Sequence, residues 1–141
     1  MTNWIRGLAL LASFFTTVLA GPVGAGDAQP SAEARALLSR QFDAFARDDA
    51  AGAYALVTPA LKMTFTDPDV FMGMVRNRYA PVYRHRSFEF GEAKSYDGKI
   101  YQQVHIIDAS GDAWEALYTL EPQPDGTFKI SGCVLKKAVT S

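Results

Sequence analysis

The chain has 141 residues, of which 48% are hydrophobic, and a formal net charge of −1 at pH 7. This length and composition fit one globular domain with an apolar core, and the near-zero charge excludes the basic surface typical of proteins that bind nucleic acid or anionic membranes. The single cysteine, Cys133, excludes an internal disulfide framework.

The amino-terminal segment has the pattern of an export signal. Arg6 and the amino group form a basic start, an apolar segment follows from Gly7 to Ala20, and small residues precede two candidate cleavage points, after Ala20 and after Ala25. The apolar segment is shorter than the ~20 residues that a membrane-spanning helix needs. We therefore predict a signal peptide over residues 1–25, a periplasmic or secreted protein, and no membrane anchor after processing.

The first helix is predicted to follow a short spacer. Glycine and proline in residues 26–31 favour a flexible segment, and Ser31 is a good N-cap for a helix. Leu38, Phe42 and Phe45 then lie at i, i+4 and i+7, which is the spacing of one helix face. We expect this face to pack in the core.

A second, short helix is expected after the sequence RDDA. Asp48 or Asp49 can cap its amino end. The helix should stop at Thr58 and Pro59, because the residue before a proline avoids helical geometry.

A third helix is predicted from the sequence TDPD. Thr66 or Asp67 serves as its N-cap, and Pro68 fits the first turn, where its missing N–H has no intrahelical partner to lose. Pro81 ends this helix. Its apolar face should carry Phe71, Met74, Val75 and Tyr79.

The hydrophobic period then changes from the helical value to two, which indicates β-strands. Asp97 and Gly98 form a strong signal for a tight hairpin turn. Helices followed by strands with short connections predict an α+β fold, in which the amino-terminal helices pack on a curved antiparallel sheet of about four strands. The expected strands are residues 87–96, 99–108, 113–121 and 127–137.

Side chains alternate between the two faces of a sheet, so even-numbered residues should face the helices and odd-numbered residues the outside, unless a bulge reverses the order. The outer face would then carry more apolar side chains than is usual for a solvent-exposed surface, and we expect a homodimer to form through it. Its apolar members would be Tyr101, Ile107, Leu117, Cys133 and Leu135.

Arg84 and Arg86 are the candidate anion-binding residues. In an extended segment they share a face with Phe88 and Phe90 and border the apolar interior, where their guanidinium groups could hold a carboxylate or phosphate. In the alternative interpretation their stems cover the core edge and their heads pair with helix carboxylates. His85 would point the other way, into solvent.

Three further polar residues are candidates for lining a pocket. Gln102 and Tyr118 are the inward polar groups of the central strands, and Tyr54 can reach inward from its helix. The sequence contains no nucleophile–base pair, metal-ligand cluster or glycine-rich phosphate loop, so we expect no metal and no cofactor. Catalysis is the less favoured function.

Three segments carry a family resemblance: FDAFARDDAAGAYALVTP, FMGMVRNRYAPVYRHRSFEFGE and AWEALYTLEPQPDGTFKISGC. They resemble an uncharacterised bacterial family of the nuclear transport factor 2-like, or ketosteroid isomerase-like (cystatin-like), superfamily. The resemblance covers residues 33–136 and implies a cone-shaped domain over residues 32–138 with a pocket inside the cone.

The resemblance leaves three functions open. The favoured one is a non-catalytic module that binds a small anionic or apolar ligand, or a protein. The first alternative is an isomerase- or lyase-type enzyme that uses Tyr54, Tyr118 or a helix aspartate in the pocket. The second is an accessory subunit whose pocket is filled by its own aromatic side chains.

Overall fold

The computed structural model describes residues 25–139, with side chains described from Ser31 onward. The predicted signal peptide therefore lies outside the described residues, apart from its last position. Within the described part, no helix is long and apolar enough to cross a membrane. The helices are α1 (Ala25–Ala46), α2 (Ala50–Tyr54), α3 (Pro59–Thr64), α4 (Pro68–Arg78) and α5 (Ala80–Tyr83), and the strands are β1 (His85–Tyr96), β2 (Lys99–Asp108), β3 (Ala113–Pro122) and β4 (Phe128–Lys137).

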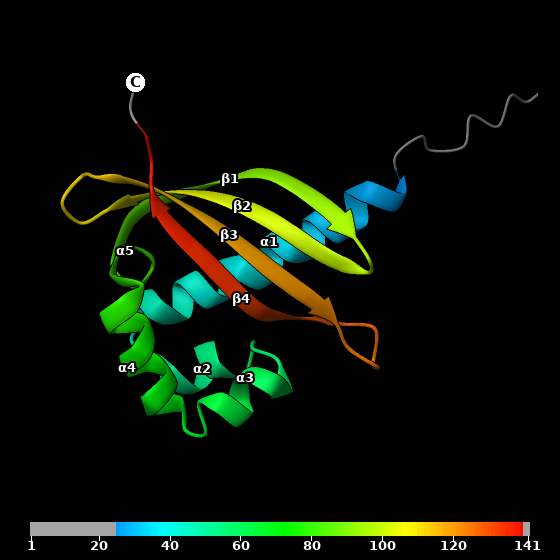
Figure 1. Ribbon diagram of the computed structural model, residues 1–141, viewed down its shortest axis with the longest axis horizontal. Helices are drawn as coiled ribbons and strands as arrows, with labels where there is room; N and C mark the ends of the chain where they lie inside the picture. Colours follow the sequence, from blue (N-terminus) through cyan, green and yellow to red (C-terminus); the bar gives the residue numbers. More distant parts are fainter. Residues whose placement is uncertain (1–24, 140–141) are drawn as a thin grey trace, which may run out of the picture.

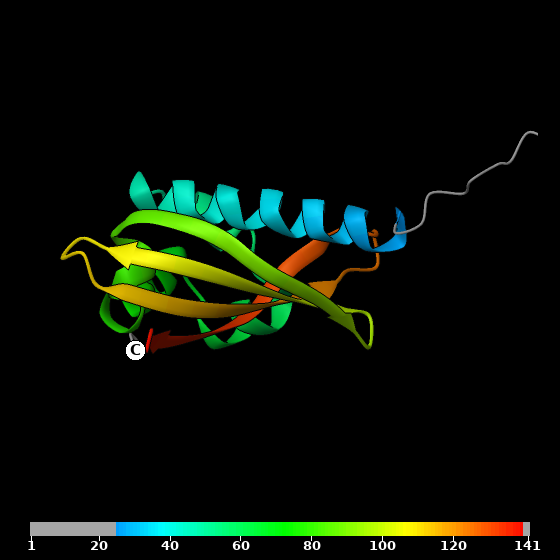
Figure 2. The same ribbon diagram turned by 90° about the horizontal axis from the view of Figure 1, so that it is seen from above.

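The strands form one antiparallel sheet in the order β1-β2-β3-β4. Asp97 and Gly98 join β1 to β2 with φ angles of 52° and 77°, as a tight hairpin turn of the predicted kind requires. Helix α1 lies along one face of the twisted sheet, α2 to α4 gather on the β4 side of it, and α5 lies at the end of the sheet where β1 begins (Figures 1 and 2). The predicted α+β arrangement of helices on a curved antiparallel sheet is confirmed.

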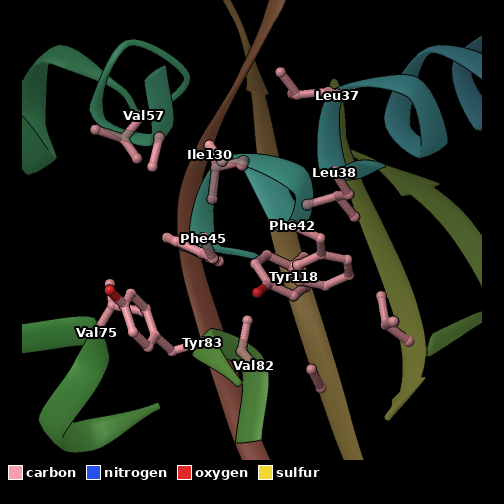
Figure 3. Packing of buried hydrophobic residues seen from close by; sticks show 14 of the residues in the cluster. Leu37, Leu38, Phe42, Phe45, Val57, Val75, Val82, Tyr83, Tyr118 and Ile130 are labelled. Carbon is pink, nitrogen blue, oxygen red and sulfur yellow. The ribbon is translucent and has the colours of Figure 1, made fainter. Parts of the chain in front are cut away.

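The core lies between α1 and the inner face of the sheet. Leu38, Phe42 and Phe45 are all buried, as the predicted helix face requires. Figure 3 shows them around Tyr118 of β3, with Val82 of α5 nearby. Burying such side chains stabilises the fold by about 1.5–3 kcal/mol each.

Two helix boundaries differ from the prediction. Helix α1 begins at Ala25 rather than at Ser31, so it includes the segment expected to be a flexible spacer. Helix α2 ends at Tyr54 rather than at Thr58 and Pro59. These two residues begin α3 instead: the Thr58 hydroxyl caps it by accepting a hydrogen bond from the Leu61 N–H at 3.4 Å, and Pro59 fits its first turn.

Helix α4 follows the prediction at its amino end. The Asp67 carboxylate caps it by accepting from the Asp69 N–H at 2.8 Å, and Pro68 is its first residue. Pro81 does not simply terminate the helical segment, because it lies in the first turn of the additional short helix α5. On α4, Phe71 and Val75 are buried.

The expected faces of β4 are reversed in its second half. Thr119 pairs with Gly132 and Leu120 with Ile130, so Ser131 is an extra residue in β4. This bulge changes which side chains face inward. Val134 is 67% exposed, whereas Cys133 and Leu135 pack against the core; the prediction that the latter two belong to the outer face is therefore wrong.

A second register shift, at the start of β1, corrects the prediction for His85. The shift lies between His85 and Ser87, and it turns His85 toward the helices. Its ring centroid is 5.4 Å from those of both Phe42 and Phe88, and its Nδ1 atom is 2.9 Å from the Val82 carbonyl oxygen. His85 is half-buried rather than solvated.

Candidate ligand-binding site

A cavity of about 190 Å³ lies between the helices and the β3–β4 half of the sheet. We call it the inner cavity. Backbone hydrogen bonds hold its wall together: the Ile130 N–H donates to the Leu56 carbonyl at 2.9 Å, and the Thr58 N–H donates to the Ile130 carbonyl at 3.0 Å. The lining residues are Gln41, Phe45, Val57, Leu61, Phe65, Phe71, Met74, Val75, Arg78, Tyr79, Val82, Tyr118, Ile130, Gly132 and Cys133.

The inner cavity has an apolar floor and a partly open mouth. Its floor is formed by buried side chains, among them Phe45, Val75 and Ile130. Leu61 and Met74, from α3 and α4, are only half-buried, and Arg78 at the end of α4 is exposed. A ligand can therefore enter past α3 and α4.

The polar groups of the inner cavity, apart from Arg78, are hydroxyl, thiol and amide groups. Tyr118 and Cys133 are cross-strand partners, and both line the cavity. The Tyr79 hydroxyl donates to the Cys133 carbonyl at 3.1 Å. The Gln41 side-chain amide is buried and lies 3.5 Å from the Ala53 carbonyl, at the limit of hydrogen bonding.

These hydroxyl and thiol groups are neutral near pH 7. Burial raises the pKa of Tyr118 well above its usual value, raises the pKa of Cys133 to about 12, and raises the pKa of Tyr79. No carboxylate belongs to the cavity lining among the residues that the structure describes. The inner cavity can therefore hold an apolar group and donate hydrogen bonds, but its lining offers no carboxylate or imidazole as a general base.

A wider surface groove of about 800 Å³ adjoins the inner cavity. Arg78, Tyr79 and Cys133 line both. The carboxylate of the groove, Asp108, is already engaged, since it accepts hydrogen bonds from the Trp114 Nε1–H and from two backbone N–H groups, each at 2.9 Å. These hydrogen bonds, that of Trp114 first, hold the pKa of Asp108 below its usual value.

Arg84 lines the groove but is held in an ion pair. Its guanidinium donates to the Asp48 carboxylate at 2.7 Å and to the Phe45 carbonyl at 3.2 Å, and it stacks 4.3 Å from the centre of the Tyr83 ring. The Tyr83 hydroxyl also donates to Asp48. Asp48 follows α1, so this arrangement matches the alternative in which the arginine head pairs with a carboxylate on the helix side.

The other predicted site residues lie outside the inner cavity. Arg86 is exposed at the start of β1 and lies near Gly111. The Tyr54 hydroxyl donates to the Phe65 carbonyl at 2.6 Å and so fastens α2 to the end of α3. Gln102 is fully buried. Of the five predicted residues, only Tyr118 lines the inner cavity and only Arg84 lines the groove.

The buried Gln102 amide has a structural role in the sheet. Its Nε2 group donates to the Gly91 carbonyl at 3.2 Å and to the Gln103 carbonyl at 2.8 Å, beside the register shift in β1. Its Oε1 atom has no hydrogen-bond partner among the described residues. Gln102 thus ties down the bulged part of β1 rather than lining the inner cavity.

The sequence prediction missed Arg78, Tyr79 and Cys133 as polar lining residues. Arg78 lies four residues after Met74 and three after Val75, so the spacing on α4 carried a signal for it. Cys133 was assigned to the wrong face because the bulge at Ser131 was not foreseen. Within the described residues, no group of three or more His, Cys, Asp or Glu residues could hold a metal ion.

Comparisons with known proteins found a matching family and solved structures of similar fold. The profile of a family described as "Domain of unknown function (DUF4864)" matches residues 27–141. No curated protein matches the chain.

Several solved structures have a similar fold. A protein from Catenulispora acidiphila in complex with S-DNPA is 14% identical, with a TM-score of 0.51, over 78% of this chain and 94% of that chain. Another structure from that organism is 16% identical, with a TM-score of 0.51, over 79% and 94%. Aln2 from a Streptomyces species is 16% identical, with a TM-score of 0.50, over 77% and 91%. At these identities the similarity shows the fold alone.

Proposed function

The chain belongs to the DUF4864 family, and we propose that it is a non-catalytic module that binds a small, largely apolar ligand in the inner cavity. The observation that carries this proposal is the cavity itself, with an apolar floor and the donor groups of Tyr118 and Cys133 in its wall. Concave sites of this composition, mostly apolar with a few polar groups, are the usual form of small-molecule sites.

The volume of the inner cavity limits the size of the ligand. A dry apolar cavity of about 150 Å³ binds benzene, and the inner cavity measures about 190 Å³. One aromatic ring with a short substituent, or an aliphatic chain of similar bulk, fits this space.

Two alternatives receive less support. An isomerase or lyase would need an acid or base that changes its charge near neutral pH, and the raised pKa values of Tyr118 and Tyr79 keep both hydroxyls neutral there. An accessory subunit with a filled pocket agrees with the packed rings of Phe42 and Phe88, but the inner cavity remains open beside them.

We also propose that the domain belongs to the nuclear transport factor 2-like superfamily. The order of helices and strands supports this assignment, as does the curved sheet that partly encloses a cavity. The similarly folded protein from Catenulispora acidiphila is in complex with S-DNPA, which agrees with ligand binding by a protein of this fold. The domain would extend over residues 32–138 of an exported chain, after a signal peptide at residues 1–25.

The proposed partner of the outer sheet face is a second copy of the chain. This face exposes Leu117 and Val134, which are 44% and 67% exposed. It also carries both signs of charge close together, with Glu115 beside Lys136. Two copies related by a two-fold axis can match such a surface with itself.

Phenylacetamide and phenylacetate are suitable probes for the inner cavity, because each carries one ring. At 100 times its dissociation constant, a bound probe should raise the free energy of unfolding by ~2.7 kcal/mol, which thermal unfolding detects. Val75→Phe fills the cavity floor and should abolish this gain. Val70→Phe makes the same change at an exposed position of α4 and should preserve it. If neither probe stabilises the wild type, ligand binding in the cavity is excluded for this class.

A further inference from the structure

Arg78 is an uncompensated cation at the mouth of the inner cavity. It is the last residue of α4, its side chain is exposed, and it lines both the cavity and the groove. Among the described residues it forms no ion pair within 4 Å. Two neighbouring arginines are engaged: Arg84 pairs with Asp48, and Arg76 lies 5.4 Å from the centre of the Tyr83 ring.

The surroundings of Arg78 leave its charge available to a ligand. No carboxylate lines the inner cavity within the described chain. Asp108, the carboxylate in the groove, is already bonded to Trp114 and to backbone N–H groups. The charge of Arg78 also reaches the cavity wall, because it acts to lower the pKa of the adjacent Tyr79, against the larger effect of burial.

We infer that the ligand of the inner cavity is a small carboxylic acid, with its ring or short chain on the apolar floor and its carboxylate bound to Arg78 at the mouth. This inference rests on the proposed function of the inner cavity. A guanidinium group can bind both oxygens of a carboxylate through two parallel N–H donors. The Tyr79 hydroxyl lines the same mouth but already donates its proton to the Cys133 carbonyl, so Arg78 is the cationic donor there.

The position of Arg78 has a second physical explanation, and the test must distinguish it from ligand binding. Cations near the carboxyl end of a helix are stabilised by the helix dipole, and both Arg76 and Arg78 lie in the last turn of α4. Arg76 does not line the inner cavity or the groove. Arg76→Gln therefore removes the same charge from the same helix end and is the matched control for Arg78→Gln.

The experiment compares phenylacetate with phenylacetamide, which differ in charge but hardly in shape, by isothermal titration. In the wild type and in Arg76→Gln, phenylacetate should bind on the order of tenfold more tightly than the amide, as expected for a charge-assisted contact at an exposed site. In Arg78→Gln this ratio should fall to about one, with binding of the amide unchanged. Hexanoate and hexanamide extend the comparison to an aliphatic chain.

The outcomes separate this inference from the proposed function. Equal binding of acid and amide by the wild type would overturn the carboxylate inference and leave the cavity function intact. An equal loss in both arginine variants would also overturn it, since only net charge would then matter. Failure of all four compounds to bind would remove both proposals. Melting temperatures within a few degrees of the wild type establish that each variant is folded.

Discussion

Tyr118 and Cys133 lie opposite each other across the β3–β4 ladder, in the apolar wall of the inner cavity. The pair places the chain's one thiol next to a buried hydroxyl rather than on the outer surface. The position of the two groups affects the reactivity of the Cys133 thiol and the stability of the protein at high pH.

Cys133 should react slowly with thiol reagents in the folded protein. Its pKa of about 12 leaves very little thiolate at pH 8, and the thiolate is the reactive form. Labelling by a disulfide-exchange reagent should be at least on the order of a hundredfold slower in the native state than in denaturant. Because the chain contains one cysteine, each rate reports on this site alone. Rapid native labelling would place the thiol outside the cavity wall.

The same pair should make the protein less stable at alkaline pH. The folded-state pKa of Cys133 rises from 9.0 to about 12, so the stability due to its neutral form is complete below pH 9 and is lost as the pH rises toward 12. Tyr118, whose pKa is also raised, acts in the same direction. Denaturant titrations of the wild type and of Cys133→Ala should show a shallower loss for the variant over this range. Parallel curves would contradict the assignment.

The pair of Asp48 and Arg84 should contribute to stability with the opposite dependence on pH. The hydrogen bond from Tyr83, followed by that from Arg84, holds the pKa of Asp48 below its usual 3.8. This contribution is present above pH 3.8 and is lost as the pH falls through the lower folded-state pKa.

Asp48→Asn tests this contribution without disturbing the backbone. Asp48 has a φ angle of 54°, a left-handed conformation that asparagine tolerates. The variant should melt at a lower temperature than the wild type at pH 7, and the difference should shrink below pH 4. Asp112→Asn, at an exposed turn, serves as the control. A difference that is independent of pH would show that charge is not the cause.

The outer sheet face should determine the oligomeric state. Leu117→Lys and Val134→Lys each place a charge within the exposed apolar part of that face and should shift a dimer to a monomer in light scattering. Val70→Lys changes an exposed residue on α4 and should leave the mass unchanged. A wild-type protein that is monomeric at the working concentration would refute the proposed partner.

Sequence reasoning succeeded where the determining interactions are local. The spacing of Leu38, Phe42 and Phe45 predicted the buried face of α1, and the turn at Asp97 and Gly98 predicted the β1–β2 hairpin. Both depend on neighbours within a few residues, so the pattern is visible along the chain.

The errors came from features that depend on contacts distant in sequence. His85 and Cys133 were each placed on the wrong face because a bulge shifts the strand near them. The spacing on α4 indicated the direction of Arg78, but its place at the mouth also depends on the contact of Tyr79 with Cys133, which are 54 residues apart in sequence. The candidate site was therefore less predictable than the fold around it.

The extra residue in β4 decides which side chains of that strand line the inner cavity. Ser131 occupies the bulge, and its hydroxyl donates to the Thr119 carbonyl at 3.2 Å. Deleting this one residue would exchange the two faces of everything that follows it, so that Val134 would enter the cavity wall and Cys133 would leave it. Relatives that lack or add one residue at this point would have different side chains in the cavity wall even if all their other residues were identical.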